Sequence, residues 1–250
     1  MNVNINAIQE EIDQLFEKYE ISVITKNISM QDLQRWSGEV AIHFGLDNEN
    51  FRQVVAELFW SIAHVQISLG HAIMAMQECD SIDGTQGIAL NEEDVPSITM
   101  PEIYFWYHVY NSHECVYRCW ERINNVIKHV CFPNLTEEQF RRKYFPQTIS
   151  DLQKDTKYNK NPHLKELQNL KDHRKRASDI RNEISHGKSS PMRNMEIDGK
   201  TSRILGANGL PFVYLEYSAV SLKEEIDSII NKYEKVLPAM KTMVAFIDNI

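Results

Sequence analysis

The sequence predicts an all-α protein, organised as a four-helix up-and-down bundle with a small β-hairpin insert before the last helix. Apolar residues recur at i, i+3, i+4 and i+7, the spacing of one helix face, in four long segments. These segments cover approximately residues 48–79, 102–131, 161–186 and 221–247. Turn residues, prolines or polar stretches separate them, and 250 residues are enough to bury one substantial core.

The first two bundle helices carry long apolar faces. We expect Asn48 to cap the first helix, whose inward residues include Phe51, Leu58, Ile62 and Leu69. The second begins near Thr99 and Pro101 and stops before Pro133. Its predicted apolar side is rich in aromatic residues: Trp106, Tyr110, Tyr117, Trp120, Ile123 and Ile127.

An accessory layer is predicted ahead of the bundle. Residues 7–19 have a clean helical stripe, and residues 21–28 are β-branched and form either a short strand or an extended linker. Ser29 with Asp32 has the pattern of an N-terminal cap for a helix that ends near Gly45. We therefore divide the chain into an accessory layer over residues 1–46 and a helical bundle over residues 48–250.

The middle of the chain leads to the third bundle helix. We expect a surface loop at residues 84–96, a short helix at 136–144 and a polar connector at 149–158. Asn161 and Pro162 then supply the cap and first turn of the third helix. Its predicted apolar stripe consists of Leu164, Leu167, Leu170, Ala177, Ile180 and Ile184.

The insert before the last helix covers residues 188–219. Asp198-Gly199 is a typical hairpin turn, and residues 212–215 alternate as a further short strand. Ser221 and Glu224 match a capping box for the last helix, which Pro238 is expected to kink.

Composition and charge indicate a soluble globular protein. The chain is 42% hydrophobic and 25% charged, and its start lacks a secretory signal, so we expect a cytoplasmic protein. Cys79, Cys115, Cys119 and Cys131 contain no CxxC pair, which favours buried thiols. The net charge is −8, yet residues 154–188 hold ten Lys or Arg against five Asp or Glu, which is +5 and leaves −13 elsewhere. This local excess favours a phosphate-containing ligand at one site.

The candidate chemistry lies at the end of the third helix, in the segment Arg181-Asn182-Glu183-Ile184-Ser185-His186-Gly187. Asn182 and His186 are four residues apart and share a helix face, and a long Arg181 side chain can reach the same region. Gly187 stands where a helix C-cap is expected. His186 then lies in the last turn, where the helix dipole favours an imidazolium.

The order Arg181, Asn182, three residues and His186 resembles the signature of the HEPN superfamily, all-α domains many of whose members are metal-independent ribonucleases. The resemblance implies a motif that ends the third helix of a four-helix bundle, and two protomers whose motifs line one cleft. It therefore implies a homodimer that cleaves single-stranded RNA with no cofactor or metal, as a toxin or antiviral effector. The N-terminal layer and the insert depart from many family members.

The resemblance also implies a regulatory partner or antitoxin. Some family toxins are silenced by a nucleotidyltransferase that modifies a Tyr two residues after the motif His. Here that position is Lys188, which argues against that mode.

RNA cleavage by a 2′-hydroxyl needs a group that moves protons and a cation that offsets charge on the phosphate. We assign His186 as general base or acid, Arg181 as the phosphate clamp and Asn182 as an orienting partner. The residues expected to hold the RNA backbone are Lys171, Arg174, Lys175, Arg176 and Lys188.

Three alternatives stay open. Arg181 could pair with Asp179 or Glu183 while His186 only satisfies carbonyls at a helix end, and the basic residues could form a solvated face. A non-catalytic HEPN-like module could bind nucleotide, RNA or protein in the same place. A metal site is the rival chemistry, from His64, His71, His108, His113, Cys115 and Cys119. Their spacings match no zinc-finger or di-iron pattern, so we expect no metal.

Overall fold

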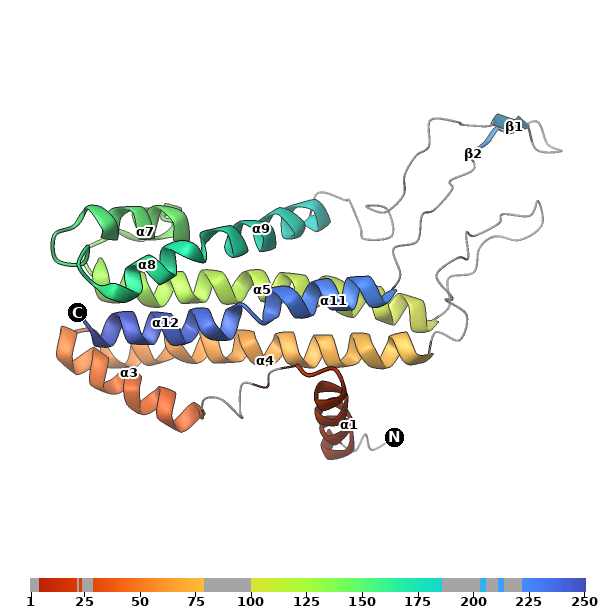
Figure 1. Cartoon of the computed structure of the whole chain (residues 1–250), viewed down its shortest axis with the longest axis horizontal. Helices are drawn as coiled ribbons and strands as arrows, with labels where there is room; N and C mark the ends of the chain where they lie inside the picture. Colours follow the sequence, from red (N-terminus) through yellow and green to blue (C-terminus); the bar gives the residue numbers. More distant parts are fainter. Residues whose placement is uncertain are drawn as a thin grey trace.

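The computed structural model describes residues 5–21, 23, 29–78, 100–185, 203–205, 211–213 and 222–250. These residues are mostly helical, which confirms the predicted all-α class (Figure 1). The helices are α1 (Ile5–Lys18), α3 (Met30–Phe44), α4 (Asn48–Glu78), α5 (Met100–Cys131), α6 (Glu137–Arg142), α7 (Phe145–Lys154), α8 (Pro162–Asn169), α9 (Lys171–Ser185), α11 (Leu222–Tyr233) and α12 (Val236–Asp248).

The two longest helices, α4 and α5, pack side by side and antiparallel. Asn111 Nδ2 donates to Ser68 Oγ at 2.6 Å, and further along the pair Arg122 Nη1 lies 3.0 Å from Glu57 Oε2. The cap of α4 is one residue earlier than predicted. The backbone N–H of Asn50 donates to Asp47 Oδ1 at 2.9 Å, so Asp47 rather than Asn48 satisfies the first turn.

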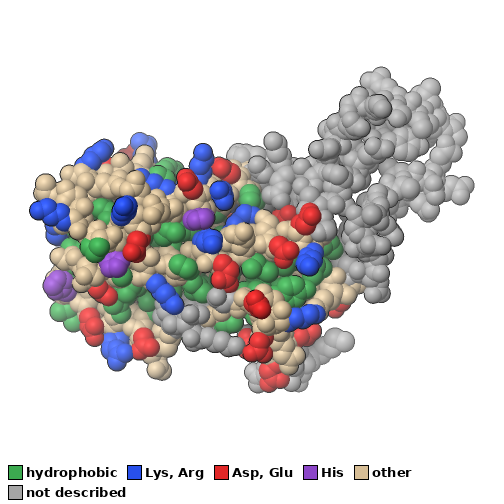
Figure 2. All heavy atoms as spheres, viewed as in Figure 1, with side chains coloured by type: hydrophobic (Ala, Val, Ile, Leu, Met, Phe, Trp, Pro, Cys, Tyr) green, Lys and Arg blue, Asp and Glu red, His purple; other side chains and the backbone are tan. Residues whose placement is uncertain are grey.

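The accessory layer packs on the outside of α4. Ser29 caps α3 as predicted, because its side chain accepts from the Asp32 N–H, and Gly45 ends α3 with a φ of 63°. Trp36 Nε1 donates to Asp248 Oδ1 at 2.7 Å, which ties α3 to the end of α12. Figure 2 shows acidic side chains gathered over α1, which carries Glu10, Glu11, Asp13 and Glu17.

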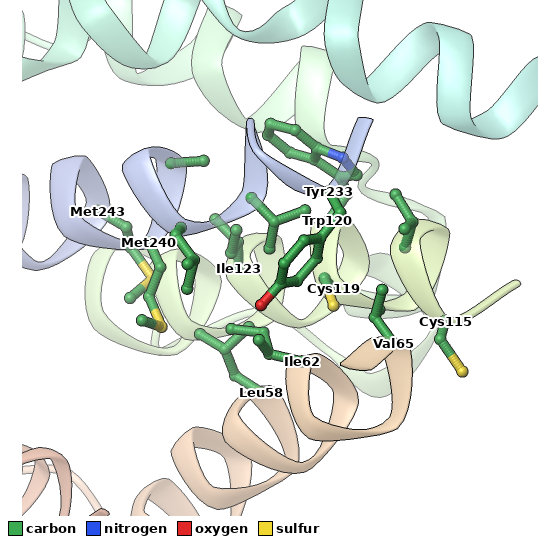
Figure 3. Close-up of a cluster of buried hydrophobic side chains, with 14 of the residues drawn as sticks. Leu58, Ile62, Val65, Cys115, Cys119, Trp120, Ile123, Tyr233, Met240 and Met243 are labelled. Atoms are coloured by element: carbon green, nitrogen blue, oxygen red, sulfur yellow. The ribbon is translucent and has the colours of Figure 1, made fainter. Parts of the chain in front are cut away.

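One apolar core runs through all these layers, from Ile12 to Ile247. Its centre lies between α4, α5, α11 and α12, which contribute Leu58, Trp120, Tyr233 and Met240 to one buried cluster (Figure 3). Each of these four side chains is at most 1% exposed. Burial of such large side chains contributes about 1.5–3 kcal/mol each, so the packing of helix faces is the main source of stability.

The third predicted helix is two helices. The chain breaks at Leu170, with α8 before it and α9 after it. The break lets each half bury its own stripe, because α8 packs mainly against α12 and α9 mainly against α5. Asn161 caps α8 as predicted, and its Nδ2 also donates to the Phe246 carbonyl at 2.9 Å.

The predicted polar connector at 149–158 was wrong for most of its length, since residues 149–154 belong to α7. Phe145, Thr148, Ile149 and Leu152 are buried at i, i+3, i+4 and i+7, which is a helical stripe that starts before the predicted connector. The short helix expected at 136–144 is confirmed as α6, with a complete capping box at Thr136.

The last helix is divided between Tyr233 and Val236, just ahead of the predicted kink at Pro238. Pro238 lies in the first turn of α12, where its missing N–H costs least.

Within the insert, β1 (Arg203–Leu205) pairs antiparallel with β2 (Pro211–Val213), and Ile204 lies opposite Phe212. Four predicted features lie outside the described residues: most of the strand or linker at 21–28, the loop at 84–96, the turn at Asp198-Gly199 and the cap at Ser221.

Helix α4 is long and apolar enough to span a membrane by length and composition, although most of its apolar window is buried inside the protein, as in a core helix. The thiols of Cys115, Cys119 and Cys131 are free and buried, as predicted, and Cys79 lies outside the described residues. Burial raises the pKa of the Cys131 thiol to about 12.

Candidate functional site

Two ion pairs hold α9 against α5. Arg181 Nε lies 3.3 Å from Glu114 Oε2, and Arg174 Nη2 lies 2.9 Å from Glu121 Oε1. The partners are seven residues apart on each helix and pair in reverse order, so the two helices run antiparallel with one face toward each other.

Tyr117 lies between these two pairs. The guanidinium carbons of Arg174 and Arg181 are 5.6 Å and 5.4 Å from the centre of its ring, within the range of a cation–π contact. Burial raises the pKa of the Tyr117 hydroxyl, and so does the charge of Glu121, which also accepts a hydrogen bond from it. The two arginines oppose this shift but do not cancel it.

A surface groove of about 480 Å³ opens over Tyr117 and the two arginines of these ion pairs. Its volume falls within the roughly 300–1,000 Å³ typical of ligand sites. The lining combines aromatic, cationic and amide groups from α5, α7 and α9: Tyr117, Tyr144, Pro146, Gln147, Arg174, Ser178, Arg181 and Asn182.

Three of the predicted site residues meet in this groove: Arg174, Arg181 and Asn182. The Arg181 side chain is 38% exposed, and its Nη1 donates to Asn182 Oδ1 at 3.3 Å. Arg174 is only 12% exposed, so it is largely committed to Glu121 and the tyrosine rings. The ion-pair partner of Arg181 is on α5, rather than being its helix neighbour Asp179; the side chain of Glu183 is outside the described residues.

The other basic residues on α9 do not line this groove. Lys175 is exposed and Lys171 is half-buried. Arg176 lines a second groove of about 150 Å³, together with His173 and residues of α11. The pKa of His173 is lowered by burial and by the charges of Lys235 and Arg176. The predicted basic surface is therefore divided between two sides of α9.

His186 and Gly187 of the motif, and the predicted RNA contact Lys188, lie outside the described residues. The described helix ends at Ser185, directly before the predicted proton-transfer residue.

The histidines and cysteines of the rival metal site do not gather at one point among the described residues. His113 Nε2 lies 2.8 Å from Glu225 Oε1, and both side chains are buried in a link between α5 and α11. His71 and His108 stack with ring centres 4.9 Å apart. Across the described ranges of the chain, no three His, Cys, Asp or Glu side chains are grouped so that they could share a metal ion.

The sequence pattern does not single out several residues of the groove or the ion-pair partner of Arg181. It places Tyr117 on the apolar side of its helix, and it does not mark Tyr144, Gln147 or Glu114. A signal was present in α5, where Glu114, Tyr117 and Glu121 share one helix face at i, i+3 and i+7. The pattern indicates part of a site only when α9 is known to pack on that face.

Comparison with known proteins gives no relative: no protein-family model, no curated protein and no solved structure matches this chain.

Proposed function

We propose that this protein is a metal-independent endoribonuclease of HEPN type that cleaves single-stranded RNA as a cytoplasmic homodimer. In this proposal α4, α5, α8 with α9, and α11 with α12 are the four bundle helices, and a hairpin insert lies between the third and fourth. The observation that carries the proposal is the groove in which Arg181 and Asn182 lie beside Tyr117 at the end of α9. A toxin or antiviral effector, regulated by a partner protein, is the biological role that fits such an activity.

The proposed reaction is attack of a ribose 2′-hydroxyl on the adjacent phosphate. His186 accepts the hydroxyl proton, the O2′–P bond forms and the P–O5′ bond breaks. The O5′ leaving group takes up a proton from water, and His186 returns its proton to the hydroxide that remains, so the products are a 2′,3′-cyclic phosphate and a 5′-hydroxyl.

Arg181 is suited to bind the phosphate in this reaction. Its guanidinium is partly exposed, while Glu114 holds Nε and Asn182 holds Nη1, which fixes its orientation. Negative charge that develops on the non-bridging oxygens would then meet a positioned cation.

The test is an RNA cleavage assay in EDTA with wild type, His186→Ala and Arg181→Ala. We expect both variants to lose cleavage of single-stranded RNA by at least about 100-fold, since each removes a group that acts on the transition state. Arg141→Ala is the matched control, because Arg141 is exposed on α6 and paired with Glu137. Full activity of both variants would refute the proposal.

The alternative is a non-catalytic module that binds nucleotide, RNA or protein in the same groove. The ion pair between Arg181 and Glu114 favours it, because a carboxylate already neutralises part of the charge that a catalytic clamp would supply. Wild type that binds RNA but never cuts it, with His186→Ala binding unchanged, would support this alternative.

A further inference from the structure

Tyr144 forms the exposed aromatic edge of the groove. It immediately precedes α7, it lines the groove, and it is 49% exposed. Its backbone N–H donates to Gln147 Oε1 at 3.2 Å, so the start of α7 fixes the position of its backbone. A large ring is therefore presented to solvent directly beside the cations of α9.

Arg174 supports that ring. Its guanidinium carbon is 5.8 Å from the centre of Tyr144 and 5.6 Å from the centre of Tyr117, so one cation contacts two tyrosines. Arg174 is itself held by Glu121 and is largely buried. This buried support makes Tyr144 a preformed platform rather than a freely rotating surface residue.

The charges of the groove limit what electrostatic attraction can contribute. Arg174 and Arg181 each have a carboxylate partner, in Glu121 and Glu114. A ligand that offers only negative charge competes with these carboxylates. A ligand that also offers a flat ring gains a second, independent contact at Tyr144, and base stacking on an aromatic side chain is favourable for every base.

We propose that the groove binds one nucleotide of a single-stranded RNA, with its base stacked on Tyr144 and its phosphate on Arg181. The inference rests on the proposed function in its choice of RNA as the ligand, and it adds the subsite that holds the base. Single-stranded RNA is the fitting substrate, since its bases are free to leave the stack. The subsite is tolerant of base identity, because stacking depends on the ring face.

The test measures binding by fluorescence anisotropy in the full-length His186→Ala chain, which is expected not to cut the probe. The probes are labelled hexauridylate and hexaadenylate. Tyr144→Ala should weaken binding of both by about 5- to 100-fold, and Tyr144→Phe should bind as the parent does. Tyr107→Ala is the matched control, because Tyr107 is 63% exposed and lies outside the groove lining.

An abasic ribose-phosphate probe separates the base from the phosphate. It should bind Tyr144→Ala and the parent equally, and lose binding in Arg181→Ala. Unchanged affinity in Tyr144→Ala, or a Tyr144→Phe chain as weak as Tyr144→Ala, would overturn the subsite whatever the cleavage assay gives. If Tyr144→Ala weakens binding as expected in a protein that never cleaves RNA, the base subsite is supported and only the proposed nuclease activity is refuted.

Discussion

Glu114 of α5 and Arg181 of α9 form an ion pair across two helices, with 3.3 Å between Oε2 and Nε. The same carboxylate accepts from Arg118 Nε at 3.2 Å through its other oxygen. The candidate phosphate clamp therefore shares its counter-ion with a neighbouring arginine. A phosphate that binds Arg181 must compete with this internal anion.

The first prediction follows from that competition. Glu114→Gln keeps the size of the side chain but removes its charge, so we expect RNA to bind about two- to fivefold more tightly, as for a partly exposed ion pair. The gain should fade at high salt, because screening weakens exposed charges. Glu10→Gln, which removes an exposed carboxylate from α1, should leave the affinity for RNA unchanged. Equal affinities for Glu114→Gln and wild type would show that phosphate does not bind at Arg181.

The helices could be predicted because their apolar periods are long and their caps have clear chemistry, as at Ser29 and Asn161. The break at Leu170 could not, since the apolar stripe continues through it and only the different partners of α8 and α9 require it. The stripe of α7 was present in the sequence, but its short length and polar flanks concealed it.

The candidate site, like the fold, could be predicted from the sequence only in part. The cluster of Arg181 and Asn182 could be located from the motif, whereas their partners come from distant segments. Tyr117 and Tyr144 join the groove only because α5, α7 and α9 pack together. No local pattern encodes that Glu114 faces Arg181 across 67 residues of sequence.

A second prediction concerns pH and the buried Lys128. Its Nζ donates to the Phe140 carbonyl at 2.7 Å, and burial lowers its pKa to about 8, with Glu121 opposing and Lys143 adding to the shift. The folded pKa is below the unfolded one, so the unfolded chain binds more protons between about pH 8 and 10.5. Stability must therefore rise with pH across that window.

Comparison with Lys128→Met isolates this effect from other titrating groups. The free energy of unfolding of wild type, relative to the variant, should rise by about 2 kcal/mol between pH 7 and 9.5. Urea unfolding at both pH values measures the difference. A constant difference would mean that the Lys128 pKa is the same in the folded and unfolded chains.

A third prediction tests the contact between the accessory layer and the bundle. A Cβ added at Gly70 of α4 would lie 2.8 Å from both Ile12 Cγ1 and Cγ2 of α1, which is too close. Gly70→Ala should therefore destabilise the protein by up to about 2 kcal/mol, since overpacking exceeds the gain in helix propensity. In an Ile12→Ala background the same change should stabilise by about 1 kcal/mol. Thermal or urea unfolding of wild type, Gly70→Ala, Ile12→Ala and the double variant measures the four free energies of unfolding. An equal effect of Gly70→Ala in both backgrounds would show that α1 does not pack on Gly70.

The last prediction concerns the proposed homodimer, in which one cleft contains two copies of the motif. One protomer offers a single Arg181 and a single His186, whereas phosphate transfer benefits from separate groups at the attacking and leaving oxygens. His186→Ala and Arg181→Ala should each be inactive alone. Mixing equal amounts after subunit exchange gives about half heterodimers, whose shared cleft contains one intact Arg181 and one intact His186. We therefore expect cleavage to return to at most about half of the wild-type rate. No recovery between subunits shown to exchange, or a strictly monomeric chain in sedimentation at micromolar concentration, would exclude a site built from both chains.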